Sequence, residues 1–293
     1  MSRVPSTVNR LIMFQNHLKI AWRSLLKNKV TGFINIIGLA IGMAVAMMIG
    51  LWLNDELTFD KFHKNYDTLA QVHLHQSFNG KTGTSTALSL PYAAHLKEEY
   101  KEDIEEVALA SWPRDFLIAV GDNRFLENGR YVESNFPKMF SLEMVAGNYE
   151  GALSKPHSII ISESVANALF SEAEAIGQTV KFNSTHDLEV TGVFKDLPMN
   201  ATFGDHKVFT TFALYEETNE WVRNSKGDWG NHSFPLFVQK KVHADFVAIS
   251  DKFKHVERIS PFWYWYFCPV LLQYRWLGIT WKGGLQVTII GLL

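Results

Sequence analysis

The feature that most constrains this chain is an uncharged run of 24 residues, Val30 to Leu53. A helix of that length is about 36 Å long, which is enough to cross a hydrocarbon core of about 30 Å with some tilt. The first 29 residues contain six cations and no acid, and Asp55 and Glu56 follow the run. Because positively charged flanks stay in the cytoplasm, this asymmetry predicts a cytoplasmic N-terminus and places everything after Leu53 outside.

Two other interpretations of this run fit less well. Ala44-Val45-Ala46 has the small-x-small form of a signal-peptidase site, but Met47 to Leu53 is still apolar behind it. A signal peptide has an apolar stretch of only about 7 to 15 residues. A buried core helix rarely needs so long an uncharged run, and a one-sided charged flank has no purpose there. The sequence therefore predicts a transmembrane helix over residues 30–53.

Small residues recur at every fourth position of the predicted membrane helix, at Gly38, Gly42, Ala46 and Gly50. This spacing puts them on one helical face, where small side chains let a second helix approach closely in lipid. Glycine is also common in membrane helices in general. Because four small residues fall in register, we predict that this face packs on neighbouring transmembrane helices.

Residues 13–29 have the pattern of an amphipathic helix. Apolar side chains follow one face, while Lys19, Arg23 and Lys27 recur at four-residue spacing on another. We predict that this helix lies on the cytoplasmic leaflet with Trp22 near the level of the lipid headgroups. The alternative is a plain cytoplasmic extension of the membrane helix, and the sequence does not separate the two.

The part beyond the membrane helix is mildly acidic. The six N-terminal cations leave 22 basic against 30 acidic residues for the rest of the chain. That balance argues against nucleic acid or anionic lipid as a partner of the outer domain. Cys268 is the single cysteine of the sequence, so no disulfide framework is available. The outer domain must be stable through its core, which about 200 residues can supply.

Residues 54–260 mix strand and helix patterns without regular alternation, which predicts an α+β domain that follows a short stalk. Apolar alternation and short apolar runs predict the strands, whereas caps and Pro91 in a first turn predict the helices. The predicted strands are 71–78, two between 107 and 132 around a turn at 121–123, 159–161, 179–182, 188–194, 208–214 and 233–239. The predicted helices are 91–101, 165–170 after the N-cap Ser162, and 244–257.

Several short motifs suggest chemistry, and each has a simpler interpretation. Gly80-Lys81-Thr82 ends like a phosphate-binding loop, but His75 stands where that motif needs glycine. His73 and His75 share one strand face without a third metal ligand, so a solvated strand face is the better interpretation. Ser162 lacks the G-x-S-x-G context of a hydrolase nucleophile, and Cys268 has no assigned base. We therefore predict no catalytic residue, no cofactor and no metal.

Several blocks in the same order carry a resemblance to a known family. The N-terminal blocks are LKIAWRSLLKNK at 18–29 and FINIIGLAIG at 33–42. The outer blocks are FPKMFS at 136–141, GN at 147–148, SESVA at 162–166, LF at 169–170, IG at 176–177 and VTGVFKDLP at 190–198. Together they resemble the start and the extracytoplasmic core domain of MacB/FtsX-type ABC transporter permeases, particularly the form common in Bacteroidetes. The resemblance covers residues 13–245.

The resemblance implies a permease subunit that is not itself an enzyme. A separate cytoplasmic ATPase would hydrolyse ATP, the permease would form a homodimer or heterodimer, and movement would pass through the membrane helices to the outer domain for export or mechanotransmission. The helix that carries Lys19, Trp22, Arg23 and Lys27 would lie at the membrane surface where the ATPase docks. The implied location is the bacterial inner membrane, with the main domain in the periplasm and no nucleic-acid partner.

The two ends of the chain fall outside this pattern. Residues 1–12 lack periodicity and are predicted to be a disordered extension. Such permeases return to the membrane for further helices after the outer domain, whereas residues 261–293 form an aromatic tail with uncharged runs of 13 and 11 residues. Those runs are too short to span a bilayer. We interpret the tail as leading toward a missing second transmembrane helix in a truncated or frameshifted gene product.

Two further function classes stay open from the sequence. A single-pass membrane-anchored periplasmic binding or sensor protein fits a chain that naturally stops at Leu293. An anchored envelope enzyme fits least, because the sequence offers no catalytic constellation. A permease fragment without a function of its own is a variant of the preferred interpretation.

Overall fold

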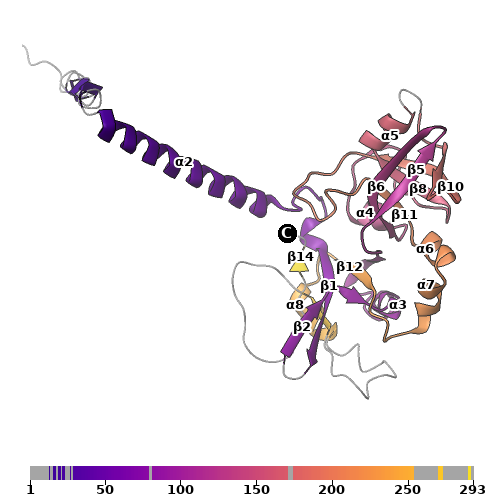
Figure 1. Ribbon diagram of the computed structural model, residues 1–293. Coiled ribbons are helices and arrows are strands. Elements are labelled where there is room, and N and C mark those ends of the chain that lie inside the picture. The colour runs from indigo at the N-terminus through magenta and orange to yellow at the C-terminus, as the bar shows by residue number, and fades with distance from the viewer. Residues whose placement is uncertain are drawn as a thin grey trace, which may run out of the picture. The chain divides into compact units, whose positions relative to one another are not determined.

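The computed structural model describes residues 29–78, 81–170, 174–253, 270–272 and 290–291, with 13, 16–17, 19–20, 22–23 and 27. The chain divides into two compact units, Met1–Leu57 and Thr58–Leu293. The first unit contains the long helix α2, and the second contains mixed strands and helices (Figure 1).

Helix α2, Lys29–Thr58, contains the whole predicted membrane run. It continues beyond Leu53, as predicted for a stalk. Gly32 is its one buried residue, so nearly all of its apolar side chains face outward, as the side chains of a lipid-embedded helix do. Within the described residues, α2 is the one helix long and apolar enough to cross a membrane. The predicted N-terminal apolar helix is therefore present.

The first sheet of the second unit is built around strand β1. Its order is β13-β1-β12-β3, with β2 and β14 also paired to β1 and β4 paired to β12. The strands are β1 Leu69–Phe78, β2 Lys81–Ser85, β3 Ala87–Leu88, β4 Ile104–Leu109, β12 Phe234–Lys240, β13 Val270–Leu272 and β14 Ile290–Gly291. The short helix η1, Tyr66–Thr68, leads into β1, while α3, Leu90–Glu99, and α8, Phe246–Phe253, belong to the same part.

The second sheet closes on itself. Its order is β7-β10-β8-β11-β6-β5-β9, and β9 also pairs with β10, so six strands form a ring to which β7 is attached. The strands are β5 Arg114–Val120, β6 Asn123–Val132, β7 Met144–Ala146, β8 Ser158–Ser162, β9 Thr179–Phe182, β10 His186–Phe194 and β11 Val208–Thr211. The helices of this region are α4 Phe136–Met139, α5 Glu163–Phe170, α6 Phe212–Thr218, α7 Glu220–Asn224 and η2 Ser225–Gly227. Closure leaves few exposed strand edges.

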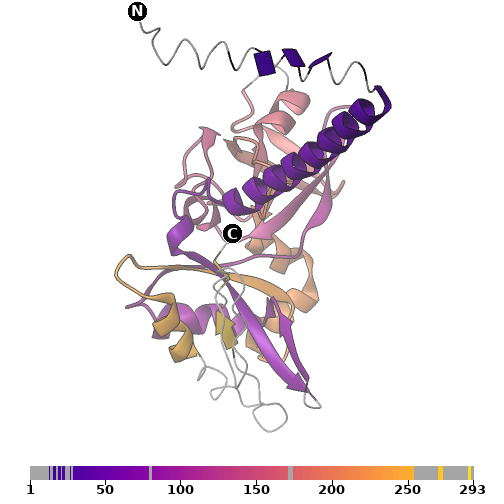
Figure 2. The same cartoon turned by 90° about the vertical axis from the view of Figure 1, so that its left-hand side faces the viewer.

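The ring is inserted into the first sheet. β1 to β4 precede it in the sequence and β12 follows it, while all of its strands lie between residues 114 and 211. β1 and β12 pair antiparallel, with Leu69 opposite Gln239. The ring and the first sheet occupy opposite ends of the second unit in both views (Figure 2). The chain therefore enters and leaves this insertion through neighbouring strands of one sheet.

A cluster of buried phenylalanines joins the two sheets. Phe237 of β12 lies 5.3 Å, between ring centroids, from Phe140, which follows α4. Phe136 of α4 lies 5.2 Å from Phe209 of β11 in the ring. Phe203 contacts the rings of all four. Because aromatic side chains each bury a large area, this cluster gives the two sheets a shared core.

Most predicted elements of the second unit are present. The predicted strands at 71–78, 159–161, 179–182, 188–194 and 233–239 correspond to β1, β8, β9, β10 and β12, and the first two helices to α3 and α5. β5 and β6 form the predicted hairpin, with Gly121 at φ 57° in its turn. α8 covers part of the predicted helix 244–257. Residues 1–12, 254–257 and most of the tail lie outside the described residues.

Two predictions about local structure are wrong. The strand predicted over 208–214 ends at Thr211, because its Oγ1 accepts the N–H of Leu214 at 3.1 Å and caps helix α6. His73, predicted on a solvated strand face, is only 4% exposed. At residues 72–74 both faces of β1 are buried, with Val72 and Leu74 on the opposite face from His73. In addition, the prediction of two strands between residues 107 and 132 did not distinguish β4 from the first strand of the hairpin, β5.

Candidate functional site

The predicted packing residues of the membrane helix all lie in α2 and are exposed. A Cβ atom added at Gly38, Gly42 or Gly50 would meet nothing within 4 Å. Ala46 continues the same row at the same spacing. This face therefore has room for a close neighbour, and its contact with other transmembrane helices stays a prediction.

The predicted cytoplasmic residues Lys19, Trp22, Arg23 and Lys27 are helical and exposed, Trp22 to 65%. The structure thus agrees with a helix in this region. Its position on the membrane surface and its contact with an ATPase stay predictions.

The chain that leaves α2 is fixed to the rest of the second unit through Asp60. Its side chain is fully buried. One carboxylate oxygen accepts the backbone N–H of Thr202 at 2.7 Å, and the other accepts the Thr202 hydroxyl at 2.6 Å. The backbone N–H of Asp60 donates to the carbonyl of Asn200 at 3.0 Å. Asn200 Nδ2 also donates to Thr58 Oγ1 at 3.1 Å. The segment 58–60 is thereby bound to a loop that lies 142 residues away in sequence.

A second set of hydrogen bonds fixes the residues that follow. His63 Nδ1 donates to the carbonyl of Phe140 at 2.5 Å. The Lys64 N–H donates to Ser141 Oγ at 2.8 Å, and Asn65 Nδ2 donates to the carbonyl of Met139 at 3.0 Å. These bonds reach the end of α4. Residues 58–65, which we call the joint, are therefore held from two sides, by loop 200–202 and by residues 139–141.

The backbone of the joint is also conformationally restricted. Asp60 has φ 58°, in the left-handed region that few non-glycine residues adopt, although Asp tolerates it better than most. Such a conformation persists only where the surroundings determine it. Here the bonds to Asn200 and Thr202 hold the backbone of Asp60 in this conformation within the second unit.

Burial shifts the pKa values of the two titratable groups of the joint in opposite senses. It raises the pKa of Asp60 to about 6, while the hydrogen bonds from Thr202 lower it in part. Burial lowers the pKa of His63 to about 4, and the bond to Phe140 opposes that change. Asp60 is therefore ionised and His63 neutral at pH 7, with 3.9 Å between His63 Nε2 and Asp60 Oδ1. The buried charge is stabilised mainly by hydrogen bonds from Thr202.

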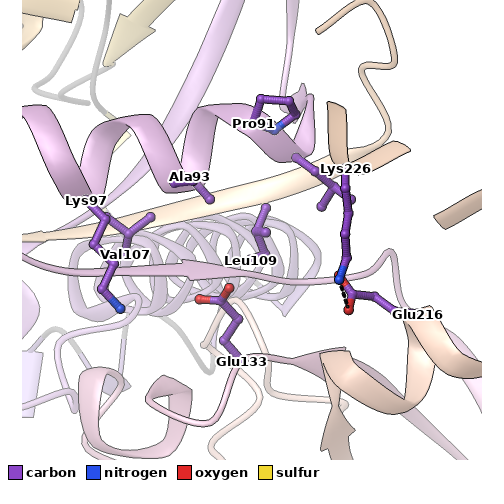
Figure 3. Close-up of a pocket in the computed structure, with 10 residues that line it drawn as sticks. Pro91, Ala93, Lys97, Val107, Leu109, Glu133, Glu216 and Lys226 are labelled. Atoms are coloured by element: carbon purple, nitrogen blue, oxygen red, sulfur yellow. Dashed lines mark ion pairs between the residues drawn. The ribbon is translucent and has the colours of Figure 1, made fainter. Parts of the chain in front are cut away.

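A second feature of interest is a cavity of about 370 Å³ beside α3, which we call the α3 pocket. Leu109 of β4 lies in its apolar floor, and Glu133, Lys97 and the ion pair of Glu216 with Lys226 give it charged walls (Figure 3). It lies between the first sheet and the helices that follow the ring. The pocket is open to solvent on one side and has both apolar and charged surfaces.

Sequence analysis did not find Asp60, Thr202 or Glu133. Asp60 stands among other charged residues just after α2, where a solvated stalk explains a carboxylate equally well. Thr202 becomes its partner only through the fold. One local signal was available, because an Asn and a Thr close together in a loop after Pro198 are typical of segments that bind backbone groups.

Comparison with known proteins agrees with this architecture. Residues 33–256 match the sequence model of the MacB-like periplasmic core domain. No curated protein matches the chain. A domain of a protein described as a permease, from Porphyromonas gingivalis, shares the fold with a TM-score of 0.55 and 19% identity, over 67% of this chain and 82% of that one.

Two other solved structures are more distant. The periplasmic region of MacB from Actinobacillus actinomycetemcomitans has a TM-score of 0.48 and 14% identity, over 67% of this chain and 86% of that one. The extracellular domain of the ABC-type transporter YknZ from Gram-positive bacteria has a TM-score of 0.47 and 14% identity, over 69% of this chain and 99% of that one. The family match itself includes most of α2, the joint and every strand of the two sheets except β13 and β14. The chain therefore belongs to the MacB-like periplasmic core domain family, the domain of MacB/FtsX-type permeases.

Proposed function

We propose that this chain is a permease subunit of an ABC transporter that passes movement from a membrane helix to a periplasmic domain. The observation that carries the proposal is the buried Asp60, which fixes the chain to the domain two residues after α2 ends. A separate ATPase in the cytoplasm would supply the movement. The domain would then use it for export or for mechanical signalling.

The bonding of the joint supports such a role because it holds the residues that follow α2 to the rest of the second unit. Hydrogen bonds to an ionised carboxylate are about twice as strong as those between neutral groups. Separating Asp60 from Thr202 would also leave a buried charge without its donors, which costs several kcal/mol by order of magnitude. A flexible linker would absorb a displacement of α2, whereas the joint passes it on to loop 200–202 and to α4.

The remaining parts of the chain have roles in the same proposal. The N-terminus lies in the cytoplasm of a bacterium, where Lys19, Trp22, Arg23 and Lys27 contribute to the surface on which the ATPase docks. The row from Gly38 to Gly50 packs on transmembrane helices of the same or a second permease. The second unit lies in the periplasm, anchored at the inner membrane by α2, a helix of about 45 Å.

The proposal is tested in two stages with the full chain. First, the tagged chain is purified in mild detergent, and mass spectrometry identifies what co-purifies; we expect an ATPase of the ABC type. Second, hydrogen exchange of the outer domain is compared with and without ATP trapped on that ATPase. We expect trapping to change exchange at residues 198–204 in the parent chain.

Two variants separate coupling from binding. Asp60→Ala should retain the ATPase but lose the response at 198–204, because the joint no longer transmits it. Asp67→Ala, which removes an exposed acid nearby, should behave like the parent. Failure of any ABC-type ATPase to co-purify, or an unchanged response in Asp60→Ala, would contradict the proposal.

A further inference from the structure

The α3 pocket has the size and the floor of a small-molecule site. Its volume of about 370 Å³ falls in the range of roughly 300–1,000 Å³ typical of ligand pockets. Ala93 of α3 and Val107 and Leu109 of β4 form an apolar floor (Figure 3). Pro91, in the first turn of α3, extends this floor at one end. A compact apolar group can lie against these side chains and lose part of its contact with water.

Glu133 places a carboxyl group in this apolar setting. Its backbone N–H donates to the carbonyl of Leu109 at 3.2 Å, which holds the residue against β4. Its carboxylate points toward Leu109 and α3, with Lys97 to one side and Glu216 with Lys226 to the other (Figure 3). Among the residues that the structure describes, no cation lies within ion-pair distance of Glu133. A carboxylate half-removed from water is stabilised by a cation that reaches it.

The charged groups around Glu133 leave room for such a cation. Glu216 of α6 and Lys226 of η2 form an ion pair of 2.9 Å and largely neutralise each other. Glu106 of β4 accepts a hydrogen bond from Asn135 Nδ2 at 2.8 Å and adds negative charge. Lys97 of α3 is exposed, so its charge is screened by solvent. Around Glu133 this leaves the carboxylate of Glu106, which does not line the pocket, and the solvated ammonium group of Lys97.

Burial and these neighbours also set the protonation of Glu133. Burial raises its pKa to about 7, the Leu109 backbone and Lys97 lower it, and Glu216 and Glu106 raise it again. At neutral pH the group is thus divided between its two forms. A bound cation would draw it to the ionised form, and binding would release protons.

We infer that the α3 pocket binds a small organic ammonium ion, whose charged nitrogen pairs with Glu133 and whose apolar part lies on Ala93, Val107 and Leu109. An organic anion would be repelled by the Glu133 carboxylate, and a neutral molecule of the same shape would gain only the apolar contact. The cavity is too small for a large ligand. This inference does not depend on the transport function, because it needs only the pocket.

The test uses the full chain in lipid nanodiscs and phenethylammonium as the probe. Isothermal titration calorimetry should detect binding at millimolar concentration, after subtraction of the heat from empty nanodiscs. Phenethyl alcohol and phenylacetate have a similar ring and chain, and we expect each to bind at least tenfold more weakly. Equal binding of the amine and the alcohol, or no binding of the amine, would overturn the inference.

Three variants locate the site. Glu133→Gln keeps the size of the side chain and removes its charge, so we expect at least a tenfold loss of affinity for the amine. Ala93→Leu fills the floor while it keeps Glu133, and should cause a similar loss. Asp122→Asn, in the exposed turn of the β5–β6 hairpin, should bind like the parent. Parent-like binding in both pocket variants would place the amine elsewhere.

The pH dependence supplies a readout that a merely structural role of Glu133 would not give. With a pKa of about 7, its ionised fraction rises from about a tenth at pH 6 to about nine tenths at pH 8. We therefore expect affinity for phenethylammonium to rise nearly tenfold over that range. The charged groups that face Glu133 are Lys97, Glu106, Glu216 and Lys226. This rise in affinity with pH should disappear in Glu133→Gln. If the rise persisted in that variant, a titratable group other than Glu133 would be its cause.

Discussion

The glycines of α2 and those of the ring have the same side chain and opposite surroundings. In α2, a Cβ atom added at Gly38 or Gly42 would meet nothing within 4 Å. In the ring, a Cβ atom at Gly129 would overlap the carbonyl oxygen of Val208, its partner across the parallel pair of β6 and β11. Just after β7, the strand attached to the ring, a Cβ atom at Gly147 would lie 2.8 Å from the carbonyl oxygen of Thr191 in β10. Packing within the fold explains why glycine is needed at the positions in and beside the ring. No contact within the described residues requires glycine at the α2 positions.

The two regions also differ in what stabilises them. A membrane helix satisfies its backbone polar groups within itself and needs only an apolar surface toward lipid. The second unit depends on side chains that meet from distant parts of the sequence, as in the phenylalanine cluster. The free energy of unfolding of the second unit should therefore respond strongly to small changes in the ring and the joint, and hardly at all to changes in α2.

The largest effect on that free energy should come from Gly129→Ala. The added methyl group meets backbone rather than a movable side chain, so β6 and β11 must separate. We expect a loss of about 3 kcal/mol or more, at the upper end for overpacked sites. Thermal unfolding of the purified chain measures it. Gly227→Ala is the matched control, because a Cβ atom there meets nothing within 4 Å. Parent-like stability of Gly129→Ala would mean that the ring is looser than described.

The next largest effect should be a change in pH dependence in Asp60→Asn. The pKa of Asp60 is raised to about 6, so its contribution to stability is fully present below pH 3.8 and is lost as pH rises through 6. The pKa of His63 is lowered to about 4, so its contribution is present above pH 6.5 and is lost as pH falls through 4. In the parent these two contributions oppose each other between about pH 4 and pH 6.5.

Asp60→Asn leaves the His63 contribution unopposed. Between pH 6.5 and pH 4, the variant should lose about 2–3 kcal/mol more than the parent, since each pKa unit is worth about 1.4 kcal/mol. Chemical denaturation at several pH values measures the difference. His63→Gln should show the opposite deviation. Parallel pH curves for the parent and both variants would show that neither group is buried in solution.

How far the sequence predicts this molecule depends on the range over which each feature is determined. α2 follows from an uncharged run and its flanks, and β8 with α5 follows from Ile159–Ile161 and the cap Ser162. Each of these features is set within about twenty residues. The family resemblance extended the prediction to the domain as a whole, and the match over 33–256 confirms it.

The features that sequence did not predict are set by long-range contacts. Asp60 binds loop 200–202, and His73 lies in a part of β1, residues 72–74, that is buried on both faces. Closure of the ring depends on the pairing of β9 with β10 as well as β5. The change from strand β11 to helix α6 at Thr211 is the exception, because it depends on a local signal. Thr211 caps the helix, but the apolar residues around it favoured the prediction of a continuous strand.

A smaller effect is expected for Thr202→Val. This change keeps the shape of the side chain and removes one of the two donors to the Asp60 carboxylate. Hydrogen bonds to charged groups contribute about 1.5–3 kcal/mol, so we expect a loss of about 1.5 kcal/mol at pH 7 and a smaller loss at pH 4. Thr179→Val, at an exposed position of β9, should change stability by less than about 0.5 kcal/mol. Equal losses of stability at both pH values would show that the contribution of Thr202 does not depend on the ionisation of Asp60.

The smallest effect on the second unit should come from Gly42→Leu. The added side chain has open space around it, so thermal unfolding and membrane insertion should match the parent. Assembly with other transmembrane helices should nevertheless fall, because the row of small residues is interrupted. Crosslinking in membranes measures assembly, with Ile41→Leu as the control on another face. Undiminished assembly of Gly42→Leu would leave ordinary membrane-helix composition as the explanation of the row.

The pairing of Leu69 with Gln239 has a mechanical consequence. These residues lie where the chain enters β1 and where it nears the end of β12, side by side at one end of two antiparallel strands. Tension that pulled these two residues apart would break the hydrogen bonds between β1 and β12 one pair at a time. In this geometry a sheet offers the least resistance to separation of its strands. In the proposed function, tension from α2 would reach the joint before it reached Leu69. The hydrogen bonds of Asp60 and His63 would then distribute that force over loop 200–202 and the end of α4 before it could separate β1 from β12.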